Sequence, residues 1–488
     1  MEIAVAERLI AASRIPGRTP LTRQQILGFW AAWAGWTLDG MGSFIYALVL
    51  SPALTELLPR SGIESSPHNV GFAGSVLFAL FLVGWGLAFL WGPLADRFGR
   101  TRVMAATIVV YSVFTGVAAL SQNVWQLATF RLLAGIGIGG EWALAGTYVA
   151  EAWPEDRRKM GAGYLQTGYY AGFFLASALD YTVGARYGWR AMFLCGLAPV
   201  VLAFLILRHV KEPERWQRAA PGSSVRRSGK DRPPVILSGA NDLRGFVRYN
   251  GIRATAEILR SAQDDIFRIS SELFGGESRL RRIFSRNYRR RTLVNSALLS
   301  VAIVGLWAGA VYEPTAVLLL AAKAGITGAH ATRTVSVASA VLALGTILGC
   351  LLVPPLAERF GRKPTLGFYF LGMGATILLG FGWAFYLPHG LYPFISVLFF
   401  LGFFGGNFAL FSLWLPEQYG TSVRATAFAF ATSFGRFIGA GMNFLLGAMV
   451  RRLGTLGTPV AFTSVAFALG LLLLPFAEET RGSSLPDE

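Results

Sequence analysis

Five charged side chains stand deep inside long apolar stretches of the 488-residue chain, where an ionised group is costly to bury. Three are carboxylates and two are guanidinium groups: Asp39, Glu141, Glu313, Arg131 and Arg436. A buried carboxyl group can exchange a proton near neutral pH, because burial favours its neutral form. A guanidinium group can bind a carboxylate through two parallel hydrogen bonds. These residue types could therefore hold an anion and move a proton.

The apolar stretches that carry these charges are each near the ~20 residues needed to span a bilayer. With 53% hydrophobic and 15% charged residues, the chain is far more apolar than soluble proteins, which carry about 25% charged residues. The pattern predicts an all-α, polytopic membrane protein. Its twelve predicted segments are Ile26–Leu50, Val70–Trp91, Val103–Leu120, Val124–Ala150, Gly161–Gly184, Arg190–Leu207, Thr292–Leu320, Val335–Val353, Leu366–Leu387, Tyr392–Leu415, Ala425–Val450 and Val460–Phe476.

A charged turn occurs at matching points of the two halves of this pattern. Residues 92–102 read Gly-Pro-Leu-Ala-Asp-Arg-Phe-Gly-Arg-Thr-Arg, and residues 356–363 read Leu-Ala-Glu-Arg-Phe-Gly-Arg-Lys. The repetition indicates an internally duplicated protein. Its predicted parts are a lead (1–25), a six-helix bundle (26–208), a loop (209–291), a second six-helix bundle (292–476) and a tail (477–488).

Lys and Arg gather at these turns and in the loop 209–291, which carries about +10 of the net charge of +17. The positive-inside rule makes this side cytoplasmic, and an even number of spans places both termini there. The expected location is the plasma membrane, or the inner membrane of a bacterium. We interpret the loop as a largely disordered connector whose basic clusters could touch anionic lipid headgroups. Nucleic acid is not an expected partner.

Other chemistries have no support in the sequence. Cys195 and Cys350 lie singly in apolar stretches, and the four histidines are scattered, so neither a disulfide framework nor a metal site is predicted. No Gly-x-x-x-x-Gly-Lys-Ser/Thr motif occurs, and the glycines at 135–140 lie inside an apolar span with no preceding strand. We expect no cofactor and no enzyme activity.

Several motifs resemble those of the major facilitator superfamily of secondary transporters. The turn contains Gly-x-x-x-Asp-Arg-x-Gly-Arg at 92–100, and Arg131–Trp142 is similar to that superfamily's Arg-x-x-x-Gly-x-Gly fourth helix. Residues 211–216 and 479–482 match common signatures at the ends of its two halves. The resemblance implies twelve helices in two six-helix bundles, with transport by alternating access.

Within that superfamily, three stretches resemble proton-coupled organic-anion carriers of the sialate and aromatic-acid type: Trp36–Gly40, Thr147–Pro154 and Leu415–Arg436. One departure is Gly42, where the first-helix motif of those carriers has a second acid. The resemblance implies proton symport of a small organic anion, such as a monocarboxylate, sialic acid or aromatic acid, by a monomer. Two alternatives stay open: a proton-driven exporter of drugs or metabolites, and a non-transporting sensor that signals through the loop 209–291.

The resemblance and the chemistry of the side chains together suggest roles for the charged and polar residues inside the spans. Candidate substrate-binding residues are Arg131, Arg436, Tyr169, Gln166 and Asn407, and candidate proton carriers are Asp39, Glu141 and Glu313. Glu313 precedes a proline, so a bend there could form an outer gate in which Glu313 pairs with Arg131. The alternatives are structural salt bridges for the arginines, a helix cap for Asp39, and packing for the aromatic residues.

The resemblance also implies a cytoplasmic network of charges that closes the inner side. Its candidate members are Asp96, Arg97, Arg100, Arg102 and Glu151 in the first half, and Glu358, Arg359, Arg362 and Glu417 in the second. The alternative is a set of ordinary interfacial charges that reflects only topology.

Overall fold

The computed structural model describes residues 19–87, 91–212, 279–420, 423–482 and 486, and every regular element among them is a helix. The predicted loop 209–291 therefore lies largely outside the described residues. In the first half the helices are α2 (Arg23–Arg60), α3 (Pro67–Gly86), α4 (Trp91–Phe98), α5 (Arg100–Val117), η2 (Ala118–Leu120), α6 (Val124–Ala152), α7 (Glu155–Leu179), η3 (Asp180–Gly184), α8 (Ala185–Cys195) and α9 (Pro199–His209).

The second half repeats this succession of long helices. They are α13 (Arg279–Ile283), α14 (Arg289–Lys323), α15 (Gly328–Phe360), α16 (Arg362–Ile377), η6 (Leu378–Trp383), η7 (Ala384–Tyr386), α17 (Leu391–Gly405), α18 (Phe408–Trp414), η8 (Leu415–Gln418), α19 (Arg424–Leu453), α20 (Gly457–Phe462), α21 (Ser464–Leu473) and η9 (Leu474–Phe476).

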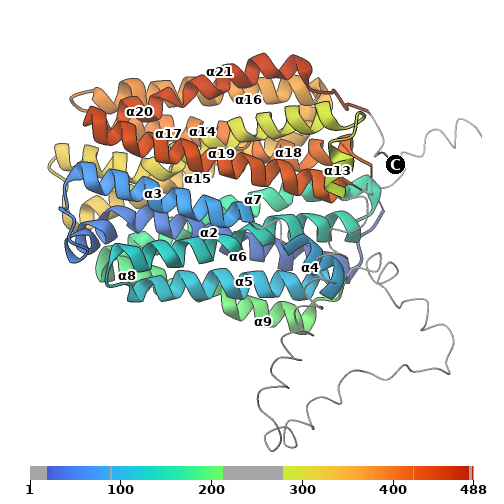
Figure 1. Ribbon diagram of the computed structural model, residues 1–488, viewed down its shortest axis with the longest axis horizontal. Coiled ribbons are helices and arrows are strands. Elements are labelled where there is room, and N and C mark those ends of the chain that lie inside the picture. The colour runs from blue at the N-terminus through green and yellow to red at the C-terminus, as the bar shows by residue number, and fades with distance from the viewer. Residues whose placement is uncertain (1–18, 88–90, 213–278, 421–422, 483–485, 487–488) are drawn as a thin grey trace, which may run out of the picture.

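These helices form twelve passes that run side by side along the long axis of the molecule (Figure 1). Within the described residues, nine helical stretches are long and apolar enough to cross a membrane. One of them, Gly163–His209, holds two passes that are separated at Gly188, where φ is +77°. The helices α6 and α14 complete the twelve, so the predicted number of spans is confirmed.

Local sequence explains where several helices begin. Thr22 and Gln25 form a capping box at the start of α2, in which each side chain accepts a hydrogen bond from the other's backbone N–H. Asn123 caps α6 by accepting from the backbone N–H of Gln126 at 2.9 Å. The helix α14 continues without a break through Pro314.

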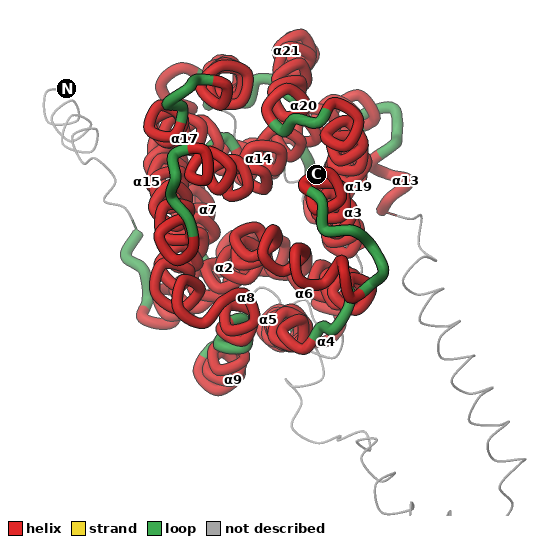
Figure 2. Tube along the Cα trace, turned by 90° about the vertical axis from the view of Figure 1, so that its left-hand side faces the viewer, coloured by secondary structure: helices red, strands yellow, loops and turns green. Residues whose placement is uncertain are grey.

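The two halves meet along pairs of helices, one from each half. The helix α3 packs against α19, and α7 packs against α15. Figure 2, viewed along the helices, shows α3 beside α19 on one side and α7 beside α15 on the other. We call the end of the bundle that holds residues 22 and 479 the terminal end, and the opposite end, with Arg60 and Gly325, the distal end.

Polar contacts join the halves toward the distal end. Tyr312 of α14 and Ser75 of α3 share a hydrogen bond of 2.6 Å. Ser336 of α15 donates to the Asp180 carboxylate of η3 at 3.0 Å. One turn away on α15, the Arg333 guanidinium stacks on the Tyr181 ring, 5.4 Å from its centroid. In this conformation these contacts keep the halves together at the distal end.

Candidate functional site

All five in-span charges predicted from the sequence are buried in the centre of the bundle. Four of the side chains have no exposed surface, and Arg436 is 5% exposed. They come from α2, α6, α14 and α19, so both halves contribute. Ionised groups in such surroundings require partners or a function, because unpaired burial is costly.

Arg436 projects from α19 of the second half onto aromatic rings of the first half. Its guanidinium carbon lies 4.4 Å from the ring centroid of Trp85 on α3 and 5.4 Å from that of Trp142 on α6. Within the described part of the chain, its guanidinium group has no hydrogen-bond or ion-pair partner, and its electrostatic neighbours are Asp39 and Tyr169. Cation–π contacts hold the cation in place while its N–H donors stay available.

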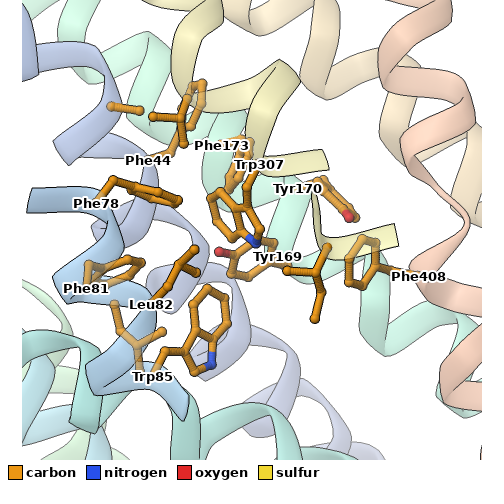
Figure 3. Packing of buried hydrophobic residues seen from close by; sticks show 14 of the residues in the cluster. Phe44, Phe78, Phe81, Leu82, Trp85, Tyr169, Tyr170, Phe173, Trp307 and Phe408 are labelled. Atoms are coloured by element: carbon orange, nitrogen blue, oxygen red, sulfur yellow. The ribbon is translucent and has the colours of Figure 1, made fainter. Parts of the chain in front are cut away.

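A small cavity lies beside this guanidinium group. Arg436, Gln166 and Tyr169 line it together with aromatic residues of both halves, namely Trp36, Trp85, Trp142, Tyr170, Trp307 and Phe408. Its volume is about 20 Å³, which is enough for roughly one water molecule. Figure 3 shows Trp85, Tyr169 and Trp307 converging on this region. A larger substrate can enter only if the halves move.

The predicted pocket residues are thus only partly brought together. Gln166, Tyr169 and Arg436 line one cavity, whereas the Asn407 amide donates to the Phe404 carbonyl at 2.9 Å and does not line it. Trp85 and Trp307 were not predicted from the sequence. Phe78, Phe81 and Trp85 recur on one face of α3, and this periodicity is the signal that could have revealed Trp85.

Arg131 lies in an aromatic setting of its own. Its guanidinium carbon is 4.1 Å from the Tyr46 ring centroid and 4.4 Å from that of Phe81. All three guanidinium nitrogens lack hydrogen-bond partners among the described residues. The pairing with Glu313 that the sequence suggested is not formed in this conformation, because Glu313 instead accepts a hydrogen bond from Ser339 at 2.9 Å.

The close approach of α3 and α6 brings Phe81 over Arg131. A β-carbon at Gly84 or at Gly135 would collide with the backbone of the opposite helix. The missing side chains therefore let the two helices touch, as small residues do in membrane bundles.

The two inner carboxylates lie near each other. Asp39 has no hydrogen-bond partner among the described residues, and its electrostatic neighbours are Glu141 and Arg436. Glu141 accepts one hydrogen bond, from the Thr107 hydroxyl at 3.3 Å, and its carboxylate fills the space beside Gly35 on α2. This arrangement places Asp39 within electrostatic reach of both Glu141 and Arg436.

At the terminal end, the second half contains a compact network of charges. Arg362 donates to both oxygens of Glu417, at 3.0 and 2.8 Å, and to Glu358 at 3.0 Å. Arg362 and Glu417 are buried, whereas the Glu358 side chain is 50% exposed. Of the other predicted members, Arg102 and Arg359 are exposed and Arg100 is partly buried. The side chains of Asp96, Arg97 and Glu151 lie outside the described part of the structure.

A second kind of polar contact at the terminal end, between a carboxylate and the start of a helix, occurs in both halves. Glu212 accepts from the backbone N–H of Thr101 at 3.0 Å, and Glu479 accepts from that of Arg362 at 2.9 Å. Each carboxylate thus binds the free N–H groups at the start of a helix, where negative charge is favourable. Gly361 precedes one of these helices with φ of +101°, and a β-carbon there would lie 2.9 Å from Glu479. Glu212 follows the last helix of the first half and Glu479 follows that of the second. Each therefore binds the repeated turn of its own half.

No group of three or more His, Cys, Asp or Glu side chains among the described residues is placed to hold a metal ion.

Comparison with known proteins agrees with this geometry. A model described as the Major Facilitator Superfamily matches residues 32–441. The probable 4-methylmuconolactone transporter of Cupriavidus pinatubonensis is 29% identical over 480 residues, which cover 95% of this chain and 92% of that protein. The sialic acid transporter NanX of Escherichia coli is 31% identical over 186 residues, which cover 38% of this chain and 44% of that protein.

A solved structure supports the same fold. The xylose transporter XylE from E. coli, in a partially occluded inward open conformation, matches with a TM-score of 0.69 at 19% identity and covers 95% of this chain and 100% of that one. The family match spans most of the chain, and the twelve helices and two packed halves fit it. The chain therefore belongs to the major facilitator superfamily and is a multi-pass membrane transporter, not an enzyme.

Proposed function

We propose that this transporter carries a small organic anion together with protons, by alternating access about the centre of the bundle. Arg436 binds the carboxylate of the substrate, with Gln166 and Tyr169 beside it. Asp39 and Glu141 carry the proton. The terminal end, with the repeated turns and the loop 209–291, faces the cytoplasm, and residues 26–208 and 292–476 are the two halves that move.

The observation that carries this proposal is the state of the Arg436 guanidinium group. It is buried, contacts no anionic side chain among the residues that the structure describes, and lines the central cavity, yet two indole rings fix its position. A structural arginine at such a depth would pair with a carboxylate of its own bundle. An arginine held by rings instead keeps its N–H donors for a ligand.

Charge balance links the anion to the proton. Arg436 and Asp39 are electrostatic neighbours, and a substrate carboxylate that binds Arg436 brings a second negative charge to Asp39 and Glu141. Protonation of one of these acids removes that repulsion. Anion and proton therefore occupy the closed site together more favourably than either alone.

The contacts at the two ends fit alternating access. Ser75–Tyr312 and Asp180–Ser336 join the halves toward the distal end, and these two hydrogen bonds must break for the site to open there. Within the second half, the network around Arg362 keeps the ends of three passes together at the terminal end.

A ligand screen tests the proposal. Purified protein is heated with monocarboxylates, sialic acid and aromatic acids at two pH values, and the unfolding temperature is followed. At least one acid should stabilise the protein, and Arg436→Ala should weaken its binding by about 10- to 100-fold, since a charge-assisted hydrogen bond contributes about 1.5–3 kcal/mol. The matched control is Arg451→Ala, because Arg451 lies on the same helix and over Phe72 but is exposed.

Transport in proteoliposomes completes the test. With a pH-sensitive dye inside, uptake of the stabilising acid should acidify the lumen, and Asp39→Asn should remove the acidification. The anion assignment fails if no acid stabilises the protein, or if Arg436→Ala behaves like Arg451→Ala. Uptake without proton movement would contradict the symport.

A further inference from the structure

We propose that Arg131 and Arg436 are the two ends of one substrate site, and that this site selects a planar dicarboxylate. The inference rests on the proposed function, because it takes Arg436 as one anion-binding end. It adds a second cation and a substrate class.

Arg131 is the stronger evidence for an anion-binding site, since none of the described acidic side chains compensates its charge. Its side chain has no exposed surface, and Nε, Nη1 and Nη2 all lack hydrogen-bond partners within the described residues. Its electrostatic neighbours are the hydroxyl groups of Tyr46 and Tyr169, and no carboxylate is among them. Glu313, the acid expected to pair with it, is bound to Ser339. The missing negative charge can come from a ligand.

The two guanidinium groups contact two neighbouring aromatic rings on α3. Arg131 stacks on Phe81 and Arg436 stacks on Trp85, each 4.4 Å from the ring centroid. These two rings lie one helical turn apart, with centroids separated by 5.7 Å. Tyr169 interacts electrostatically with both arginines. The two cations therefore contact neighbouring rings of α3 and share Tyr169 as an electrostatic neighbour.

The side chains packed beside the two cations are mostly flat aromatic rings. Trp307 packs against Trp85 at 5.5 Å and against Tyr169 at 6.4 Å between ring centroids. Figure 3 shows Leu82 among Phe81, Trp85, Tyr169 and Trp307. Aromatic faces favour flat, unsaturated or aromatic molecules, which stack on them. A planar skeleton with a carboxylate at each end would place one anion on each arginine.

The two arginines belong to different halves of the protein, and this explains why a dicarboxylate would be preferred. Arg131 belongs to the first half and Arg436 to the second, so a ligand with two carboxylates joins the halves when they close around it. A ligand with one carboxylate leaves one guanidinium group buried without an anion, which is strongly unfavourable. The closed state is therefore best satisfied by the dicarboxylate.

Matched ligands test this inference. The probes are fumarate, trans,trans-hexadienedioate and terephthalate, three planar diacids of increasing length, each compared with its own monomethyl ester. The wild-type protein should bind at least one diacid about tenfold or more tightly than its ester. Arg131→Gln should abolish this preference without weakening the binding of the ester. Arg436→Gln should weaken diacid and ester alike.

Two outcomes overturn the inference while leaving the proposed function intact. One is wild-type protein that binds no diacid more tightly than its ester, and the other is Arg131→Gln protein that retains the preference. If Arg131→Gln does not fold, Arg131→Lys keeps the charge but loses the planar donor pair, and it must reduce the preference without affecting the ester. Wild-type protein that binds an acid of the earlier screen but none of these diacids refutes the inference alone, and protein that binds no acid of either set refutes the proposed function as well.

Discussion

Replacement of Glu417 by Gln tests whether the network at the terminal end stabilises the protein. Glu417 accepts both parallel hydrogen bonds from Arg362, and both side chains are excluded from solvent. Glu417→Gln keeps the size of the side chain but removes its charge and one acceptor oxygen. Glu358→Gln is a matched control, because Glu358 binds the same guanidinium group from a half-exposed position.

The expected magnitudes follow from burial. Removing one partner of a buried ion pair costs about 3–5 kcal/mol, and here the buried Arg362 would keep only the half-exposed Glu358 as its anionic partner. Removing the exposed partner costs about 0.2–1 kcal/mol, because water screens and replaces it. A unit of roughly 150–250 residues, such as one half of the molecule, loses about 2–4 °C of unfolding temperature per kcal/mol. Glu417→Gln should therefore lower the unfolding temperature by about 6 °C or more, and Glu358→Gln by less than about 4 °C.

Thermal unfolding of the purified variants in detergent, followed by tryptophan fluorescence, measures both values. The measurement is repeated at low and high salt. Salt should reduce the smaller effect of Glu358→Gln and leave that of Glu417→Gln nearly unchanged, since mobile ions do not reach the buried pair. Equal shifts for the two variants, or equal sensitivity to salt, would show that burial of this pair does not determine its contribution.

Two further substitutions probe the other sites. Gly361→Ala should destabilise the protein by about 1–3 kcal/mol more than Gly325→Ala, because both residues have positive φ but only the first β-carbon would displace Glu479; equal unfolding temperatures would refute this. Glu313→Gln can still accept a hydrogen bond from Ser339 but cannot ionise, so we expect a folded protein whose transport rate depends differently on pH; an unchanged rate and pH profile would exclude Glu313 from proton movement.

Hydropathy predicted the passes well but not their full lengths. The first segment was predicted to end at Leu50, whereas α2 continues to Arg60. Its last turns are held by Glu56, which accepts from Arg190 at 2.8 Å and pairs with Arg60. A sliding apolar window detects only the part of a helix that lies in hydrocarbon, so the polar extension beyond it goes unseen.

The sequence predicts which charged residues belong to the site, but it does not predict which residues they contact. The sequence identified Asp39, Arg131, Glu141, Glu313 and Arg436, because a charge inside a long apolar run stands out without any knowledge of its neighbours. It could not identify the partners of those charges, which lie on other helices.

Order and spacing along one chain are enough to predict the duplicated twelve-helix plan, the repeated turns, and the depth of the charges along each helix. The packing of the helices, in contrast, places Arg436 over Trp85 of the other half, and Arg131 against Tyr46 and Phe81 rather than Glu313. The physical reason is that these contacts depend on how α3 packs against α6 and α19, and such packing fixes rotations between helices that are far apart in sequence.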